Sequence, residues 1–394
     1  MSFQILRLLV TLGLALHFLV RLRLAYGSGH WFTAVALVLL VLILPQSWPD
    51  QVHSWPAAEW LLTAGPLTLG YLILFLLAVL AFDLLRLALA GAVALGAPAD
   101  QMGFLTAPKA VSMALILAAA ALLNSYHMAY TPKLVKVELA TAKLPAGTDE
   151  LRIVQVSDIH LSRFIGLGEL KNLMDLVQGA APDLVVFTGD ILDSPAGAAC
   201  EQEAALLAGL RPPLGVFAVL GNHERYFGLP AALDFYRRAG LKLLRGQAEE
   251  TGGLVVAGVD DEVFGGRPDP GRFLEAFRDD HRFILFLKHR PTPAPGSQGL
   301  FDLQLSGHTH GGQIWPNHFP TTLVNGLLRG LHPAPDRGWV YISRGAGFWG
   351  LPLRFLAPPE VNLFILRRSA QTRQQFDLES TASQTTIQNG SFGS

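Results

Sequence analysis

Long apolar runs without charged residues limit the fold of the first third of this chain. A helix that crosses a bilayer needs about 20 apolar residues. Trp31 to Trp48, Trp60 to Phe82 and Ala110 to Tyr130 contain no Asp, Glu, Lys or Arg, so each run predicts a membrane-spanning helix. Hydrophobic residues make up 51% of the 394 residues and charged residues only 15%, which is typical of a chain that lies partly in lipid.

The first apolar stretch, Met1 to Val20, carries Arg7 and has a shorter uncharged core than the other three. A spanning helix, an interfacial helix and a signal peptide are all compatible with this pattern. We favour a retained helix, because Arg21 and Arg23 follow the stretch where a signal peptide would have a small-residue cleavage site. Residues 1–130 are therefore predicted to form a membrane domain of about four helices.

The distribution of basic residues predicts the orientation of an integral protein in the cell (inner) membrane. Arg21 and Arg23 follow the first stretch, whereas Pro49 to Glu59 contains no Lys or Arg, so the arginines are assigned to the cytoplasm. Three later spans then deliver the rest of the chain to the extracytoplasmic side. Lys133 and Lys136 argue for the opposite orientation.

From Thr131 the sequence alternates between short β-rich runs, Gly/Pro turns and helical segments, as a water-exposed α/β domain does. We place this domain at 131–368. A polar tail of low hydrophobicity, 369–394, is predicted to be disordered. The single cysteine, Cys200, excludes an internal disulfide and a thiolate metal site. A net charge of -1 gives no reason to expect a nucleic-acid partner.

Five short apolar runs within 131–368 each end in a polar cluster. Their length and their content of Val, Ile and Phe predict buried strands. The clusters that follow the strands are Ser157-Asp158-Ile159-His160, Thr188-Gly189-Asp190 with Asp193, Gly221-Asn222-His223-Glu224, Lys288-His289-Arg290, and Ser306-Gly307-His308-Thr309-His310. Because loops at the carboxyl edge of an α/β sheet converge, these side chains are expected to form one site.

The residue types in the five clusters predict a metal site. A mixed set of carboxylate, amide and imidazole groups suits Mn, Fe or Zn. Two ions roughly 3.5–4 Å apart need about seven side-chain ligands when one carboxylate bridges them. The clusters supply seven candidates: Asp158, His160, Asp190, Asn222, His289, His308 and His310. Each motif alone is weak, and the ordered set carries the prediction.

The order Asp-x-His, Gly-Asp-x-x-Asp, Gly-Asn-His-Glu, a lone His and Gly-His-Thr-His resembles the calcineurin-like metallophosphoesterases. The residues that follow, and the apolar first third of the chain, are similar to the transmembrane metallophosphoesterase subgroup. The resemblance implies an α/β fold in which N-terminal transmembrane helices precede a two-sheet αββα sandwich. Glu224 stands where many relatives have Asp, outside the implied set of ligands.

The resemblance also divides the ligands between two divalent metal ions. It implies that Asp190 bridges both ions. It assigns Asp158, His160 and His310 to one ion, and Asn222, His289 and His308 to the other.

The implied reaction is hydrolysis of a phosphoester or pyrophosphate bond by a metal-bridging hydroxide. His223 is the predicted proton donor to the leaving group, or it orients a ligand. Asp193 is predicted to orient a ligand histidine, or to cap a helix. Arg344 is predicted to bind substrate phosphate, or to form a structural salt bridge. Trp315 lies close to the predicted site in sequence and has two interpretations, an aromatic platform for substrate and ordinary packing.

Membrane anchoring favours the lipid bilayer as a partner, and a phosphorylated small molecule or a lipid-linked substrate. One alternative activity is that of a UDP-2,3-diacylglucosamine-type pyrophosphatase of lipid A metabolism, which acts on the cytoplasmic face. An alternative of another class is a non-catalytic membrane receptor or scaffold that binds a phosphorylated ligand. A nuclease is disfavoured, because the sequence shows no basic groove.

Overall fold

The chain divides into two units, each described by itself in this computed structural model. The first contains Met1–Ala129 and Trp349–Phe355, and the second contains Tyr130–Phe348 and Leu356–Ser394. Described residues are 3–43, 56–97, 106–193, 201–265, 269–278, 281–292, 294 and 296–369. Cys200 and the predicted tail beyond Ser369 lie outside them. The domain boundaries at residues 130 and 368 stay a prediction.

The first unit is helical. Its helices are α1 (Phe3–Tyr26), α2 (His30–Ile43), α3 (Pro56–Ala94) and α4 (Ala107–Ala129). Three of them, over Leu8–Tyr26, Trp60–Ala94 and Ala107–Ala129, are long and apolar enough to cross a membrane. Helix α2 is shorter, and the last five residues of its predicted span, 44–48, lie outside the described residues. The uncertain first stretch is thus part of a helix of spanning length.

Charged residues close to the apolar helices pair with each other in the first unit. Arg21 on α1 and Asp83 on α3 form an ion pair of 2.5 Å. Helix α3 continues through Asp83, beyond the end of the predicted span at Phe82, and the ion pair offsets the cost of the Asp83 charge there. An unpaired charge in an apolar bundle would be costly, whereas a paired one is tolerated.

The segment Trp349–Phe355 packs among the helices of the first unit. Phe355 packs against the apolar cluster formed by α1 to α4. The Arg354 backbone N–H donates to the carbonyl of Ser125, 3.0 Å away, on α4. A Cβ atom at Gly70 would collide with the end of the Leu353 side chain, so glycine at position 70 leaves room for that side chain as it lies. Packing of a segment so distant in sequence was not predicted.

Two mixed β-sheets form the framework of the second unit. Their strands are β1 (Lys133–Thr141), β2 (Glu150–Val156), β3 (Leu184–Phe187), β4 (Val216–Ala218), β5 (Lys242–Leu243), β6 (Gln247–Thr251), β7 (Leu254–Val259), β8 (Phe283–Lys288), β9 (Leu303–Ser306), β10 (Gly330–Pro333), β11 (Trp339–Ile342) and β12 (Glu360–Arg368). The strand orders are β1-β12-β2-β3-β4-β5 and β10-β11-β9-β8-β7-β6. Parallel pairing joins β2, β3 and β4 in one sheet and β7, β8, β9 and β11 in the other.

The two sheets share one apolar core. It contains Ile153, Val186 and Phe217 from the first sheet together with Val256 and Leu285 from the second. All five side chains are buried, and burying each one contributes roughly 1.5–3 kcal/mol. Side chains of both sheets therefore interdigitate as in a β-sandwich.

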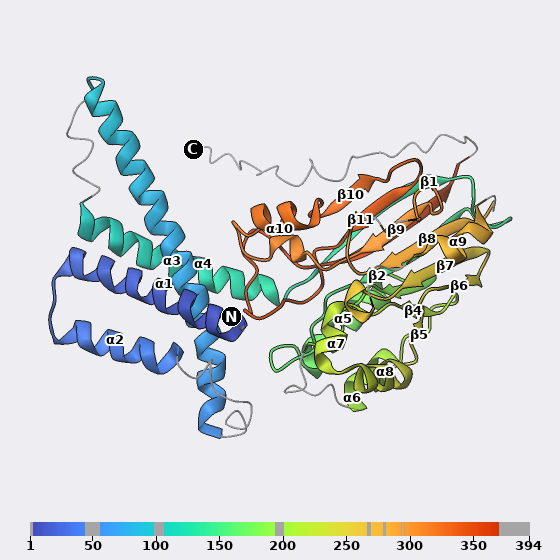
Figure 1. The fold of residues 1–394 in the computed structure, drawn as a ribbon, viewed down its shortest axis with the longest axis horizontal. Helices are drawn as coiled ribbons and strands as arrows, with labels where there is room; N and C mark the ends of the chain where they lie inside the picture. Colours follow the sequence, from blue (N-terminus) through green and yellow to red (C-terminus); the bar gives the residue numbers. More distant parts are fainter. Residues whose placement is uncertain are drawn as a thin grey trace, which may run out of the picture. The chain divides into compact units, whose positions relative to one another are not determined.

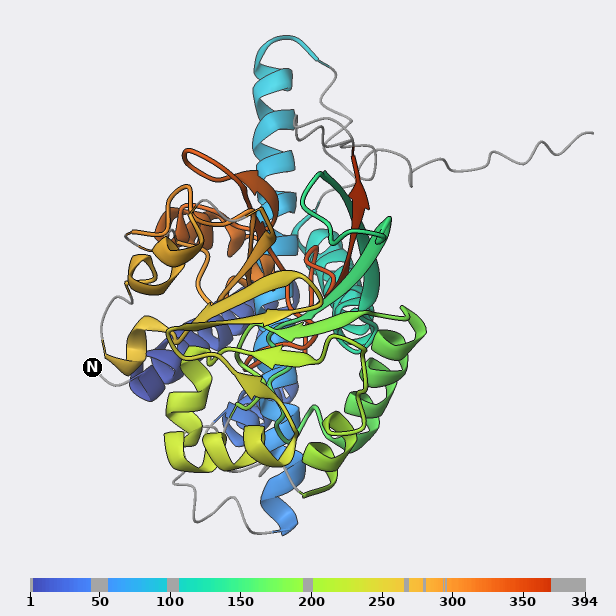
Figure 2. The ribbon, with the colours of Figure 1, turned by 90° about the vertical axis from the view of Figure 1, so that its right-hand side faces the viewer.

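Helices flank the sheets on opposite sides. The α-helices are α5 (Leu167–Gly179), α6 (Glu201–Leu207), α7 (Asn222–Phe227), α8 (Leu229–Arg238), α9 (Gly271–Leu274) and α10 (His318–Asn325), and the 3-10 helices are η5 (Glu262–Phe264), η6 (Glu275–Phe277) and η7 (His310–Gly312). In Figure 1, helices α5 to α8 lie below the strands, whereas α10 lies beside β10. In Figure 2 the green and yellow-green helices lie to the right of the strands and below them, and the orange segment that includes α10 lies at the upper left. The predicted two-sheet α/β class of fold, with apolar helices before it, is confirmed.

Candidate metal centre

The five predicted strands are present, and each runs up to its polar cluster, with Val219 and Leu220 between the end of β4 and Gly221. They are β2, β3, β4, β8 and β9. Five of the residues that follow them have left-handed backbone conformations: Asp158 (φ 53°), His160 (φ 56°), Asp190 (φ 53°), His308 (φ 71°) and His310 (φ 50°). Non-glycine residues rarely adopt this conformation, and it is concentrated at functional sites. The sharp turns aim all five side chains into one region.

Glycine at two positions allows these loops to approach each other closely. A Cβ atom on Gly307 would collide with the side chains of Ser157 and Asp158, and one on Gly221 would collide with the Asp190 carboxylate. Any other residue at either position would push a carboxylate away from the site. The glycines thus set the distance between the clusters.

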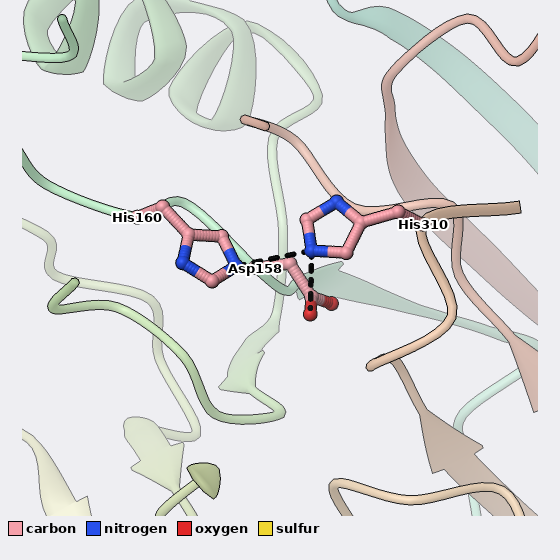
Figure 3. A group of neighbouring side chains, drawn as sticks. All are labelled: Asp158, His160 and His310. Carbon is pink, nitrogen blue, oxygen red and sulfur yellow. Dashed lines mark hydrogen bonds and ion pairs between the residues drawn. The ribbon is translucent and has the colours of Figure 1, made fainter. Parts of the chain in front are cut away.

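One group of potential ligands contains Asp158, His160 and His310, whose ligand atoms all lie within 4.8 Å of one another. Nε2 of His160 is 3.0 Å from Nε2 of His310, and the latter is 3.5 Å from Oδ1 of Asp158. The two imidazole rings point toward each other, with the carboxylate beside His310 (Figure 3). The Asp158 carboxylate also accepts the His308 backbone N–H, which links this group to the next ligand loop.

A second group gathers around Nε2 of His289. This atom lies 3.1 Å from Oδ2 of Asp190, 3.2 Å from Oδ1 of Asn222 and 3.2 Å from Nδ1 of His308. The other ring nitrogen of His289, Nδ1, lies 2.8 Å from the carbonyl of Thr188. A donated Nδ1–H would fix the tautomer that leaves a lone pair on Nε2.

Asp190 lies between the two groups. Its Oδ2 is 3.1 Å from His289 Nε2 in one group and 3.8 Å from His160 Nε2 in the other. Its Oδ1 accepts the backbone N–H of His223 at 2.9 Å, which holds the carboxylate in place. All seven residues that the sequence singled out as ligands are therefore in one cluster.

Burial and charge perturb the titration of the second group. Burial lowers the pKa of His289, but the Asp190 carboxylate outweighs burial and raises that pKa to about 10. Burial also lowers the pKa of His308 to about 2, with the His289 charge acting in the same direction. His308 therefore offers a free lone pair, and the site as a whole attracts positive charge.

The donor set fits divalent cations on geometric grounds. Two ligand atoms that are each about 2.1 Å from an ion, and at right angles, lie about 3.0 Å apart. The separations of 3.0 Å within the first group and of 3.1–3.2 Å around His289 match this spacing. In their unprotonated forms these nitrogen and oxygen atoms turn lone pairs toward one another, and a bound cation would take the place of the proton that the Asp190 carboxylate favours on His289.

Glu224 has a structural role that the sequence did not predict. Its buried carboxylate accepts backbone N–H groups from Asp190, Ile191 and Leu192 in one loop and from Gly221 in another, at 2.8–3.1 Å. Charge-assisted hydrogen bonds of this kind are among the stronger ones. Glu224 thus fixes the loop that carries Asp190 against the loop that carries Asn222. The Gly-Asn-His-Glu spacing gives no sign of these partners.

Asp193 is shared by two histidines. Its Oδ1 lies 3.3 Å from Nδ1 of His160 and 2.8 Å from Nδ1 of His223. Burial lowers the pKa of the His223 imidazole, but Asp193 and the neighbouring carboxylates outweigh burial and raise that pKa. The contact with His160 has the geometry expected of a residue that orients a ligand histidine.

Arg344 is engaged by Glu360. Its Nε donates to Oε2 of that carboxylate at 2.6 Å, and its backbone N–H donates to Oε1 at 3.0 Å. This is the structural salt bridge that was one of its two predicted roles, and phosphate binding by Arg344 stays a prediction.

Comparison with known proteins agrees with the class of fold. The family model for calcineurin-like phosphoesterase matches residues 151–312. An uncharacterized metallophosphoesterase of Aquifex aeolicus is 37% identical over 257 residues, which are 63% of this chain and 97% of that protein. A bovine transmembrane protein with metallophosphoesterase domain is 32% identical over 278 residues, which are 66% of this chain and 62% of that protein. The UDP-2,3-diacylglucosamine pyrophosphatase LpxG of Chlamydia trachomatis is 28% identical, with 64% of this chain and 95% of that protein covered.

The clustered Asp, Asn and His side chains at the strand ends of a two-sheet sandwich, together with these relatives, identify a metal-dependent phosphoester hydrolase. The chain belongs to the calcineurin-like metallophosphoesterases. Its apolar helices and its transmembrane relatives place it among the membrane proteins of this family.

Proposed function

We propose that this protein is a membrane-anchored phosphoesterase with a two-metal centre. The observation that carries the proposal is the position of Asp190, within 3.1 Å of one ligand group and 3.8 Å of the other. We assign Asp158, His160, Asp190 and His310 to one ion, and Asp190, Asn222, His289 and His308 to the second. Manganese, iron and zinc all suit this mixed donor set.

Two bound cations would lower the pKa of a shared water and neutralise the oxygens of a phosphate group. The protein's own residues would then position the reaction. Asp158 and Asp190 counter the charge of the cations. The Asp193 carboxylate beside Nδ1 stabilises the imidazolium form of His223, and this form can donate its Nε2 proton to the leaving oxygen.

Removal of divalent cations is expected to abolish hydrolysis. Purified protein that has been stripped with a chelator should lose activity toward an aryl phosphomonoester or phosphodiester, and addition of Mn²⁺ should restore it, because the cations would activate the attacking water and neutralise the phosphate oxygens. The rate is followed by release of the chromophore. Full activity of a stripped protein with undetectable metal would refute the proposal. No activity of either the stripped or the metal-loaded protein would favour the non-catalytic alternative.

We further propose that the substrate is lipid-linked, or a lipid headgroup phosphate. Only Tyr130, Thr131 and Pro132 separate the last apolar helix from the first strand, and such a connection reaches at most about 14 Å. The second unit therefore stays at the membrane surface. A substrate that diffuses in the bilayer would be concentrated there, unlike one in bulk water.

Whether α2 crosses the membrane decides on which side of the membrane the catalytic site lies. With Arg21 and Arg23 in the cytoplasm, three later crossings give an extracytoplasmic site in the inner membrane, which is our proposal. Two crossings would return the site to the cytoplasm. A reporter that is active only outside the cytoplasm, fused after Arg368, should give signal. A silent fusion there, with signal from one after Arg23, would reverse the orientation.

A pyrophosphatase acting on a nucleotide-linked lipid is the second candidate. It is supported by the likeness to the Chlamydia trachomatis pyrophosphatase, which covers 95% of that protein. The resemblance implies that this activity acts on the cytoplasmic face, so it would require the reversed orientation. A screen of nucleotides, phospholipids and nucleotide-linked sugars with metal-loaded protein separates the two candidates.

A further inference from the structure

Helix α10 (His318–Asn325) exposes its apolar residues instead of burying them. Phe319, Leu323 and Val324 are 64%, 86% and 79% exposed, and no residue of the helix is buried. The polar residues Thr321 and Asn325 are among its half-buried positions. A helix on the surface of a water-soluble domain has the opposite arrangement, with its apolar stripe toward the core. The reversed pattern is typical of a helix whose outer face is not in water.

The apolar face continues beyond the helix. Trp315, four residues before Phe319, is 40% exposed, and it stacks with His318 at a centroid distance of 6.2 Å. Tryptophan is enriched where a protein meets the boundary between lipid headgroups and acyl chains. Arg329, just past the helix, is also exposed, and a basic residue at the edge of an apolar face favours anionic lipid.

Both ends of α10 are fixed to the loop that carries two predicted ligands. A Cβ atom on Gly312 would collide with the backbone of His318, so the start of the helix packs directly against that loop. Beyond its end, the Leu328 carbonyl accepts a hydrogen bond of 2.6 Å from Oγ1 of Thr309, which lies between His308 and His310. Whatever α10 contacts is thus held close to the metal-ligand cluster.

We propose that α10 is a membrane-docking helix that inserts Phe319, Leu323 and Val324 into the lipid interface. The occupant is the bilayer, because the connection of Tyr130, Thr131 and Pro132 keeps this unit at the membrane and leaves a lipid surface permanently within reach. Burial of exposed apolar side chains in lipid drives the docking. Docking places the ligand cluster at headgroup depth, and this last step rests on the proposed function.

The depth of α10 can be measured in the full chain. Protein with Cys200→Ser and Leu323→Cys is labelled with an environment-sensitive fluorophore and reconstituted in vesicles of phosphatidylethanolamine and phosphatidylglycerol. The matched control carries the label at Arg237→Cys, a position on α8 whose side chain is 75% exposed. Nitroxide groups on the acyl chains are expected to quench the label at 323 several-fold more than the label at 237.

Equal, weak quenching at both positions would overturn the docking proposal. Energy transfer between labels at 323 on two chains, without quenching by lipid, would overturn it in favour of contact between copies. Neither readout depends on hydrolysis, so failure of the proposed function leaves the result interpretable.

The link to substrate is tested by Leu323→Asp. The ratio of its rate on a phosphodiester carried by a vesicle lipid to its rate on a water-soluble aryl phosphodiester should fall about tenfold or more from the wild-type ratio. If this ratio is unchanged while the label on the Leu323→Cys variant is quenched by lipid, docking of α10 is retained and its role in substrate access is rejected. A conservative Leu323→Met variant should keep the wild-type ratio.

Discussion

Replacement of Asp190 by asparagine is expected to lower kcat/KM by about 10³-fold. Asparagine retains the shape of the side chain and an oxygen that can accept the His223 backbone N–H. It removes the charge that lies 3.1 Å from His289 and 3.8 Å from His160. If that carboxylate joins two cations, its loss removes several kcal/mol of transition-state stabilisation.

The Asp190→Asn variant should remain folded while it loses metal-dependent stabilisation. Addition of Mn²⁺ should raise the melting temperature of wild-type protein, since a ligand that binds only the native state stabilises it, and should raise that of the variant much less. Asp175→Asn, at an exposed position on α5, is the matched control and should behave as wild type. Near-normal kcat/KM for Asp190→Asn would show that this residue does not bridge the ions.

Replacement of His223 by glutamine is expected to lower kcat by about 10²–10³-fold for esters with poor leaving groups. An alkoxide needs a proton as the bond to phosphorus breaks, whereas a nitrophenolate leaves without one. The variant should therefore hydrolyse a nitrophenyl ester far better, relative to wild type, than an alkyl ester. The comparison of the two substrates separates proton donation from a structural effect.

A variant at Asp193 tests the same prediction for the proton donor, because the Asp193 carboxylate lies 2.8 Å from Nδ1 of His223. Asp193→Asn should show a weaker form of the same dependence on the leaving group. His281→Gln, at an exposed position, should show none. An equal loss on both kinds of ester in His223→Gln would mean that His223 only orients its neighbours.

The strand-end clusters were predictable because their signal is local. A run such as Leu184 to Phe187 has no polar residue to place in water, and the residues that follow it include Asp190. Chain order and the convergence of loops at a sheet edge are then enough to bring the clusters together. The apolar first third was equally clear, since lipid tolerates few alternatives to a helix.

Features that depend on contacts between distant segments were not predictable. Glu224 binds backbone groups of another loop, and backbone groups have no signature in the sequence. The pairing of β1 with β12 joins the two ends of the second unit. A pattern of apolar residues by itself predicts a buried helix face. Leu323 is exposed because of the place of α10 in the fold, which the pattern does not contain. Each case needs the fold before its role can be stated.

The metal content of the purified, loaded protein tests the central claim most directly. Mass-spectrometric metal analysis, combined with activity at increasing Mn²⁺, should give two ions per chain, with activity appearing as the second site fills. Full activity with a single ion per chain, or with none, would contradict the two-metal centre around Asp190.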